Sequence, residues 1–138
     1  MEEALKANAE LTIRELGPLS GLDFGYNDAS VEWLEGYIER LRQSGALQSA
    51  EQRDRLAGVL GSFLGECIVR CHGGAWAQRD GGWCIAFDAR NAAFPFAKIH
   101  KQMDHGPEDG IAGFFRTIPA VFPAATRQPR SKPWWRFW

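Results

Sequence analysis

The apolar residues of positions 30–45 recur with the period of an α-helix. They fall three or four positions apart, which places them on one face of a helix. Asp28 or Ser30 is suited to cap the first turn, and Gly45 is a typical stop signal. The pattern therefore predicts an amphipathic helix that ends at Gly45.

A longer helical pattern follows in residues 49–72. Ser49 and Gln52 form a capping box, and one apolar face then continues for several turns. Three glycines inside this helix each cost up to about 1 kcal/mol of helix propensity, so we expect another backbone to pack closely against their face. These glycines are Gly58, Gly61 and Gly65.

Downstream of this helix the apolar period changes from that of a helix to that of a strand. Residues 75–79 and 83–88 predict a hairpin, with the turn at residues 80–82. A third strand is predicted over 94–103, and a short helix that opens at a proline over 107–118. Helices, hairpin-linked strands and a final helix indicate an α+β fold: two N-terminal helices, a three-stranded antiparallel sheet, a short C-terminal helix and an extended tail.

The chain length fits one domain. Residues 1–16 show a weak helical pattern, and residues 17–28 are rich in Gly, Pro, Asp and Asn, which is typical of a loop. No linker divides the 138 residues. We therefore predict a single α+β domain over 1–124 and a basic aromatic tail over 125–138.

Charge is divided unevenly along the chain. Residues 1–66 carry a net charge of −6 and residues 67–138 a net charge of +5, although the whole chain carries only −1. Opposite charges within one chain favour docking within the molecule or between copies. A nucleic-acid-binding protein would instead present one continuous basic face, so we predict no nucleic-acid partner.

The beginning of the sequence predicts a cytoplasmic protein. The opening residues, MEEALKANAE, lack the basic and apolar regions of a secretory signal. No apolar run approaches the roughly 18 residues that cross a bilayer. The three cysteines are then expected to be reduced thiols.

Four residues could in principle form a metal or thiol site: Cys67, Cys71, His72 and Cys84. Three cysteines and one histidine are a known zinc ligand set, but the C-x2-C spacing of common zinc sites is missing. No spacing pairs a cysteine with a base, as a thiol enzyme requires. We interpret the cysteines as core residues and predict no metal, no cofactor and no catalytic residue.

The remaining ionisable residues are interpreted structurally. Glu66 lies four residues before Arg70, the spacing of an ion pair on one helix face, and this interpretation is favoured over a general acid or base. His100 is expected on a solvated strand face with Lys98, and His105 in a turn. The glycine-rich pieces do not precede a helix, so they do not predict a phosphate-binding loop.

Four short motifs resemble a family of small bacterial domains of unknown function. They are L-G-x-x-x-G-E at residues 60–66, G-G-x-W at 73–76, F-P-F at 94–96 and D-G-I-x-x-F-F at 109–115. The resemblance implies a bacterial source and a compact α+β domain. It assigns no catalytic or binding residue, and it does not include the aromatic tail.

The tail combines bases with aromatic side chains and holds no acid. Its prolines disfavour a regular helix, so we predict an extended arm. The arm could pack on its own domain or a second copy, bind another protein, or touch a membrane. Because Trp and Arg dominate binding energies in protein interfaces, partner binding is assigned to the aromatic end. Its residues are Trp134, Trp135, Arg136, Phe137 and Trp138.

These patterns together predict a small bacterial protein that binds another protein, or itself, and catalyses nothing. An adaptor or an immunity-type inhibitor of a toxin would fit. Two alternatives stay open: a metal or thiol site on Cys67, Cys71, His72 and Cys84, and peripheral membrane contact through the tail.

Overall fold

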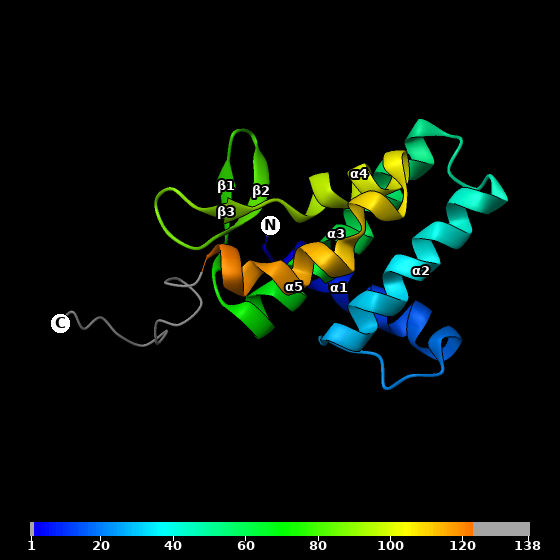
Figure 1. Cartoon of the computed structure of the whole chain (residues 1–138), viewed down its shortest axis with the longest axis horizontal. Helices are drawn as coiled ribbons and strands as arrows, with labels where there is room; N and C mark the ends of the chain where they lie inside the picture. The colour runs from blue at the N-terminus through cyan, green and yellow to red at the C-terminus, as the bar shows by residue number, and fades with distance from the viewer. Residues whose placement is uncertain (1, 123–138) are drawn as a thin grey trace.

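The computed structural model of the chain describes residues 2–122 (Figure 1). The predicted tail, 125–138, lies outside these described residues. The elements are α1 (Glu2–Ser20), α2 (Asp28–Ser44), α3 (Ala50–His72), β1 (Ala75–Arg79), β2 (Gly82–Ala86), β3 (Ala92–Ala93), α4 (Pro95–His105), the 3-10 turn η1 (Pro107–Asp109) and α5 (Ile111–Val121).

The fold is α+β, as the sequence predicted. The three strands form one antiparallel sheet in the order β1-β2-β3. The β-hairpin lies at one end of the molecule and the connection between α2 and α3 at the other (Figure 1). At the hairpin turn, Asp80 and Gly81 both have positive φ angles, 54° and 79°, as a two-residue hairpin turn requires.

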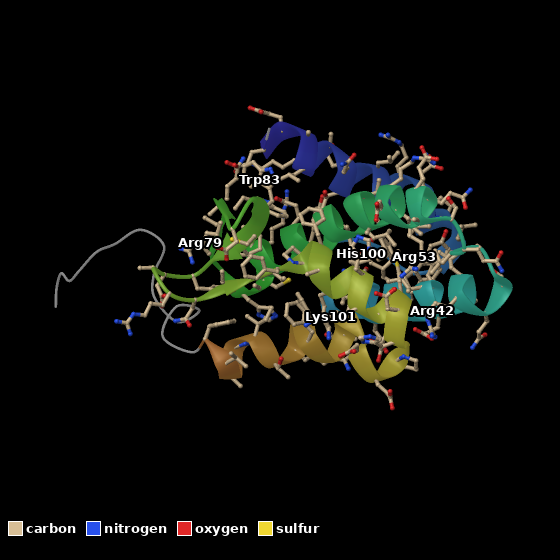
Figure 2. All side chains as sticks on the ribbon, turned by 90° about the horizontal axis from the view of Figure 1, so that it is seen from above. Arg42, Arg53, Arg79, Trp83, His100 and Lys101 are labelled. Carbon is tan, nitrogen blue, oxygen red and sulfur yellow. The ribbon has the colours of Figure 1, made fainter. Side chains whose placement is uncertain are left out.

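Helix α3 is the centre of the core. Its residues from Leu60 to Ile68 are all buried. It packs against α1, α4 and the sheet, and Figure 2 shows it between α1 on one side and α4 and α5 on the other. The remaining elements therefore cover this helix on several sides.

The ends of α2 and α3 follow the sequence signals closely. The Oγ of Ser49 accepts a hydrogen bond from the Gln52 amide, which confirms the predicted cap of α3. Gly45 ends α2 in the left-handed conformation. The cap of α2 differs from the prediction, because the side chain of Asn27 accepts the Ser30 amide at 2.8 Å.

Helix α1 is longer than its weak pattern indicated. It continues through Gly17 and Pro18 to Ser20, so the loop predicted over 17–28 begins only after Ser20. Leu5, Ala9, Thr12 and Leu16 form its buried face. The Thr12 hydroxyl donates to the Val59 carbonyl at 3.3 Å, which ties α1 to α3.

The third strand predicted over 94–103 is wrong. This segment is helix α4, and the third strand is instead the short β3 just before it. Pro95 occupies the first turn, where its fixed φ and missing N–H suit a helix. Buried Ile99, Gln102 and Met103 then follow the helical spacing rather than the alternation of a strand.

Helix α5 begins at Ile111, after the 3-10 turn, and not at Pro107 as predicted. Its first N–H groups are capped by other helices. The Gln102 side chain of α4 accepts the Ile111 amide at 3.0 Å, and the Glu35 carboxylate of α2 accepts the Ala112 amide at 2.9 Å. A side chain at Gly110 would overlap this Glu35 carboxylate, so the carboxylate could keep its place only with a residue that lacks a side chain at this position.

Candidate functional site

The predicted partner-binding residues Trp134, Trp135, Arg136, Phe137 and Trp138 lie outside the described residues. The candidate sites that the structure describes therefore lie within residues 2–122.

The cysteines and His72 do not form a shared site. Cys67 and Cys84 are fully buried, whereas Cys71 is exposed and its thiol donates to the Tyr26 carbonyl at 3.3 Å. Within residues 2–122, no group of three or more His, Cys, Asp or Glu side chains is arranged to hold a metal ion. The interpretation as core residues is thus confirmed for Cys67 and Cys84 and wrong for Cys71, which is exposed.

The thiols are not activated. Burial raises the pKa of the Cys67 thiol strongly, and burial also raises the pKa values of Cys71 and Cys84. Since the thiolate is the nucleophile and the metal ligand, all three groups are protonated and weakly reactive at neutral pH.

His72 packs against an aromatic ring, with the two ring planes tilted by 47°. Its ring centroid lies 4.4 Å from that of Phe115, and its buried Nε2 has no hydrogen-bond partner among the described residues. Burial lowers the pKa of His72, so its imidazole is neutral at pH 7.

Glu66 is buried within α3 and has two partners. The predicted ion pair with Arg70 is present, with Arg70 Nε donating to Oε1 at 3.1 Å. The other carboxylate oxygen accepts the indole N–H of Trp76 at 2.8 Å. The sequence analysis missed this indole contact, which joins α3 to β1.

His100 and His105 both lie on α4. The predicted strand position of His100 and the predicted turn position of His105 are therefore wrong. His100 Nε2 faces Asp54 of α3 at 3.6 Å, and Figure 2 shows it where α4 meets α3. His105 Nδ1 contacts Asp109 at 2.7 Å. Each histidine therefore lies against a surface carboxylate.

Aromatic rings cover two of the three α3 glycines. A methyl group at Gly65 would overlap the Trp76 ring, and one at Gly61 would overlap the Phe96 ring. The predicted close packing against the glycine face is therefore confirmed, but the predicted partner is wrong. At Gly61 and Gly65, side-chain rings rather than another backbone approach α3.

The third glycine, Gly58, is open. Apart from the backbone of α3 itself, no atom of residues 2–122 lies within 4 Å of the position that its side chain would take. It borders a surface hollow of about 460 Å³, which we call the aromatic groove. Its apolar lining residues are Leu5, Gly58, Trp83, Phe94, Phe96 and Ala97.

The walls of the aromatic groove continue the ring cluster that covers α3. The Trp76 ring lies 6.3 Å from Trp83, edge to face, and 6.0 Å from Phe96. Trp83 lies where the hairpin approaches α1 (Figure 2). Phe94 is 38% exposed, one of the few large apolar side chains exposed among the described residues.

The aromatic groove is almost uncharged. Its polar lining side chains are Asn8 and Ser62, and the Ser62 hydroxyl already donates to the Gly58 carbonyl at 2.7 Å. No Asp, Glu, Lys or Arg lines it. Such a hollow can bind an apolar ring, but it offers no group for acid–base chemistry.

Two other hollows differ in their charge. One, of about 400 Å³, lies between α1, α2 and α3 and has Glu15 and Arg55 among its lining residues. The other, of about 350 Å³, lies beside α4 and α5 and includes Lys98 and Lys101. Both are largely apolar, but each includes at least one basic side chain.

Comparisons with known proteins identify no relative. No protein-family model, curated protein or solved structure matches this chain. None of the helices in residues 2–122 combines the length and apolarity needed to cross a lipid bilayer.

Proposed function

We propose that this chain is a non-enzymatic protein-binding module, and that the aromatic groove is a contact surface of that module. The observation that carries the proposal is the open position at Gly58. Two neighbouring glycines of the same helix are each covered by an aromatic ring. No ring of residues 2–122 covers this third one, which borders a hollow of about 460 Å³.

The lining of the groove suits the rings that dominate protein interfaces. Trp and Tyr are enriched among the residues that contribute most to binding, and they bind best in well-packed apolar pockets. Trp83, Phe94 and Phe96 offer edges and faces at which a further ring can pack. We therefore expect the partner to insert a Trp or Phe side chain.

The charge of the molecule favours a basic partner segment. Residues 123–138 hold four of the sixteen Lys and Arg residues and no acid, so residues 1–122 carry a net charge of −5. A negatively charged body attracts basic segments and slows the approach of acidic ones. The proposed ligand is a peptide segment in which Trp or Phe alternates with Lys or Arg.

Trp134, Trp135, Arg136, Phe137 and Trp138 remain part of the proposal as a second contact surface. The module would then carry both a groove that accepts rings and a segment that supplies them. Adaptors and immunity-type inhibitors of toxins work through such contacts in the cytoplasm, without a cofactor, and we place this protein among them.

A labelled peptide with the sequence of residues 131–138 tests the groove. It is titrated into the full chain carrying Trp134→Ala, Trp135→Ala, Phe137→Ala and Trp138→Ala, which we call the ringless variant. Saturable binding, followed by fluorescence anisotropy, is expected because this peptide has the proposed ring and charge pattern.

Two further substitutions in the ringless variant locate the binding. Gly58→Leu fills the groove and should abolish binding. Gly113→Leu is the matched control, because Gly113 is also a helix glycine with nothing within 4 Å, and it should leave binding unchanged. An absence of saturable binding, or equal binding to both glycine variants, would contradict the proposed groove.

A further inference from the structure

We propose that the aromatic groove is occupied by Trp134–Trp138 of the same chain when no partner is bound. The segment would mask the groove, and a partner would have to displace it. This inference rests on the proposed function, because it requires that the groove binds aromatic rings.

The segment can reach the groove. The described chain ends at Phe122, whose ring stacks on Phe87 with a centroid distance of 4.7 Å. Phe87 is four residues beyond Trp83, which corresponds to about 13 Å along an extended chain. The eleven residues 123–133 can span up to about 36 Å. The connection is therefore more than long enough to bring Trp134 to Trp83.

The spacing of the rings already on α3 leaves a position for one more. Gly58 lies three residues before Gly61, about 4.5 Å along the helix. A ring over Gly58 would follow the Phe96 ring at a distance within the range of about 4.5–7 Å that aromatic pairs prefer. The rings over Gly61 and Gly65 are 6.0 Å apart, so the new ring would extend an existing series.

Charge favours this groove over the other hollows described. Residues 123–138 contain four bases and no acid. Lys98 and Lys101 line one of the other hollows, Arg42 and Arg53 line a second, and these bases repel a basic segment. The hollow between α1, α2 and α3 has both Glu15 and Arg55, whereas no base lines the aromatic groove. Asp54 lies one helical turn before Gly58 and provides a nearby acid for Arg136.

The wild-type chain and the ringless variant test this masking with the same labelled peptide. A connection of this length gives an effective concentration of about 1 mM. For a peptide Kd of about 0.1 mM, the docked segment should weaken peptide binding to the wild-type chain about tenfold relative to the ringless variant.

The outcomes separate the two proposals. Equal affinity for both chains would overturn the masking while leaving the groove as a binding site. Binding to neither chain would contradict the proposed function itself. Masking that appears only at protein concentrations where sedimentation shows a dimer would assign the groove to the segment of a second copy, and would overturn occupation by the same chain.

Limited trypsin digestion gives an independent measurement of docking, because it compares chains that keep the aromatic residues with the ringless variant and needs no peptide. Docking should slow cleavage after Arg127 and Arg130 in the wild-type chain and in Gly113→Leu. Gly58→Leu and the ringless variant should be cleaved faster, and at similar rates. Identical cleavage rates in all four chains would contradict a docked segment.

Discussion

Trp76 is held in place by two residues of α3 that are adjacent in sequence. Gly65 leaves space for the indole ring, and Glu66 accepts its N–H at 2.8 Å. Both belong to the motif L-G-x-x-x-G-E, and Trp76 belongs to G-G-x-W. The two motifs therefore meet in space, and they fix the ring from which the walls of the aromatic groove extend.

Removing the carboxylate of Glu66 should destabilise the protein. Glu66→Leu leaves the largely buried Trp76 N–H without an acceptor, which costs about 1–3 kcal/mol. Glu66→Gln keeps an acceptor and should cost less. Urea unfolding followed by circular dichroism measures the difference.

Arg70→Ala is the control for this prediction. Arg70 is half exposed whereas Glu66 is buried. In Arg70→Ala the Glu66 carboxylate keeps its Trp76 hydrogen bond, so we expect a smaller cost than for Glu66→Leu. A larger cost for Arg70→Ala than for Glu66→Leu would show that the indole bond is not the main contribution of Glu66.

Cys67 should make the protein less stable at alkaline pH. Burial raises its pKa in the folded state, so above about pH 8.5 only the unfolded chain ionises this thiol. The contribution is present below that pH and is lost as pH rises, by up to about 1.4 kcal/mol per unit. The difference between the unfolding free energies at pH 8 and pH 10 should therefore be smaller in Cys67→Ala than in the wild-type chain, with the remainder from groups such as the buried Cys84 thiol.

Cys71→Ala provides the comparison for that pH dependence. Cys71 is exposed, although its pKa is also raised by partial burial. Its replacement should change the alkaline loss of stability much less than Cys67→Ala does. Parallel pH profiles for the wild-type chain and Cys67→Ala would contradict the assigned role of Cys67.

At the residue scale, the sequence predicted contacts within one element and missed those between elements. The Glu66–Arg70 pair follows from a spacing of four residues on one helix. The Glu66–Trp76 bond depends on how the hairpin folds back onto α3, and no local spacing encodes that.

Along α3, alanine at Gly58 should change the stability in the opposite direction from alanine at Gly61 or Gly65. Gly61→Ala and Gly65→Ala would overlap the Phe96 and Trp76 rings, and overpacking of this kind costs about 1–3 kcal/mol. In the ringless variant, Gly58→Ala meets no atom and should stabilise by up to about 1 kcal/mol, as expected for helix propensity.

Thermal unfolding of the three ringless alanine variants measures this series, and Gly113→Ala gives the reference gain for an open helix glycine. A loss of stability in Gly58→Ala comparable to that in Gly65→Ala would mean that Gly58 is covered by the body of the protein. The aromatic groove would then not exist as described.

The start of α5 depends on two other helices. Gln102 is fully buried and donates to the Glu35 carbonyl at 3.0 Å, besides accepting the Ile111 amide. Gln102→Leu should cost about 1–3 kcal/mol, because it leaves buried polar groups unpaired. Hydrogen exchange of the Ile111 and Ala112 amides should accelerate.

Arg116→Ala is the matched control for this cap. Arg116 joins α5 to α2 through ion pairs with Asp28 and Glu32. These ion pairs are exposed, so their loss should cost no more than about 1 kcal/mol. Unchanged exchange rates in Gln102→Leu would contradict capping of α5 by α4.

At the element scale, prediction succeeded where local signals were strong. The capping box at Ser49 and the glycine after α2 mark true helix ends, and the Asp80-Gly81 turn marks a true hairpin. The segment 94–103 was mistaken for a strand because Lys, His and Gln alternate with apolar residues there. Gln102 is buried by its hydrogen bonds, so its polarity did not indicate exposure.

At the scale of the whole molecule, the proposed docking depends on how charges and aromatic rings are distributed along the chain. The body carries a net charge of −5 and residues 123–138 carry +4. The body also presents an uncharged groove with a place for a ring next to Phe96. Composition led to the prediction of Trp134–Trp138 as contact residues, and that assignment stays a prediction. The groove could not be predicted, because Leu5, Gly58, Trp83 and Phe94 come together only in the fold.

An NMR measurement of the Gly58 α-protons tests the central claim most directly. In the wild-type chain we predict nuclear Overhauser effects between these protons and an indole ring, and their loss in the ringless variant with a change in the Gly58 chemical shift. Identical Gly58 shifts in the two chains, without any contact to an indole, would contradict a ring seated on Gly58.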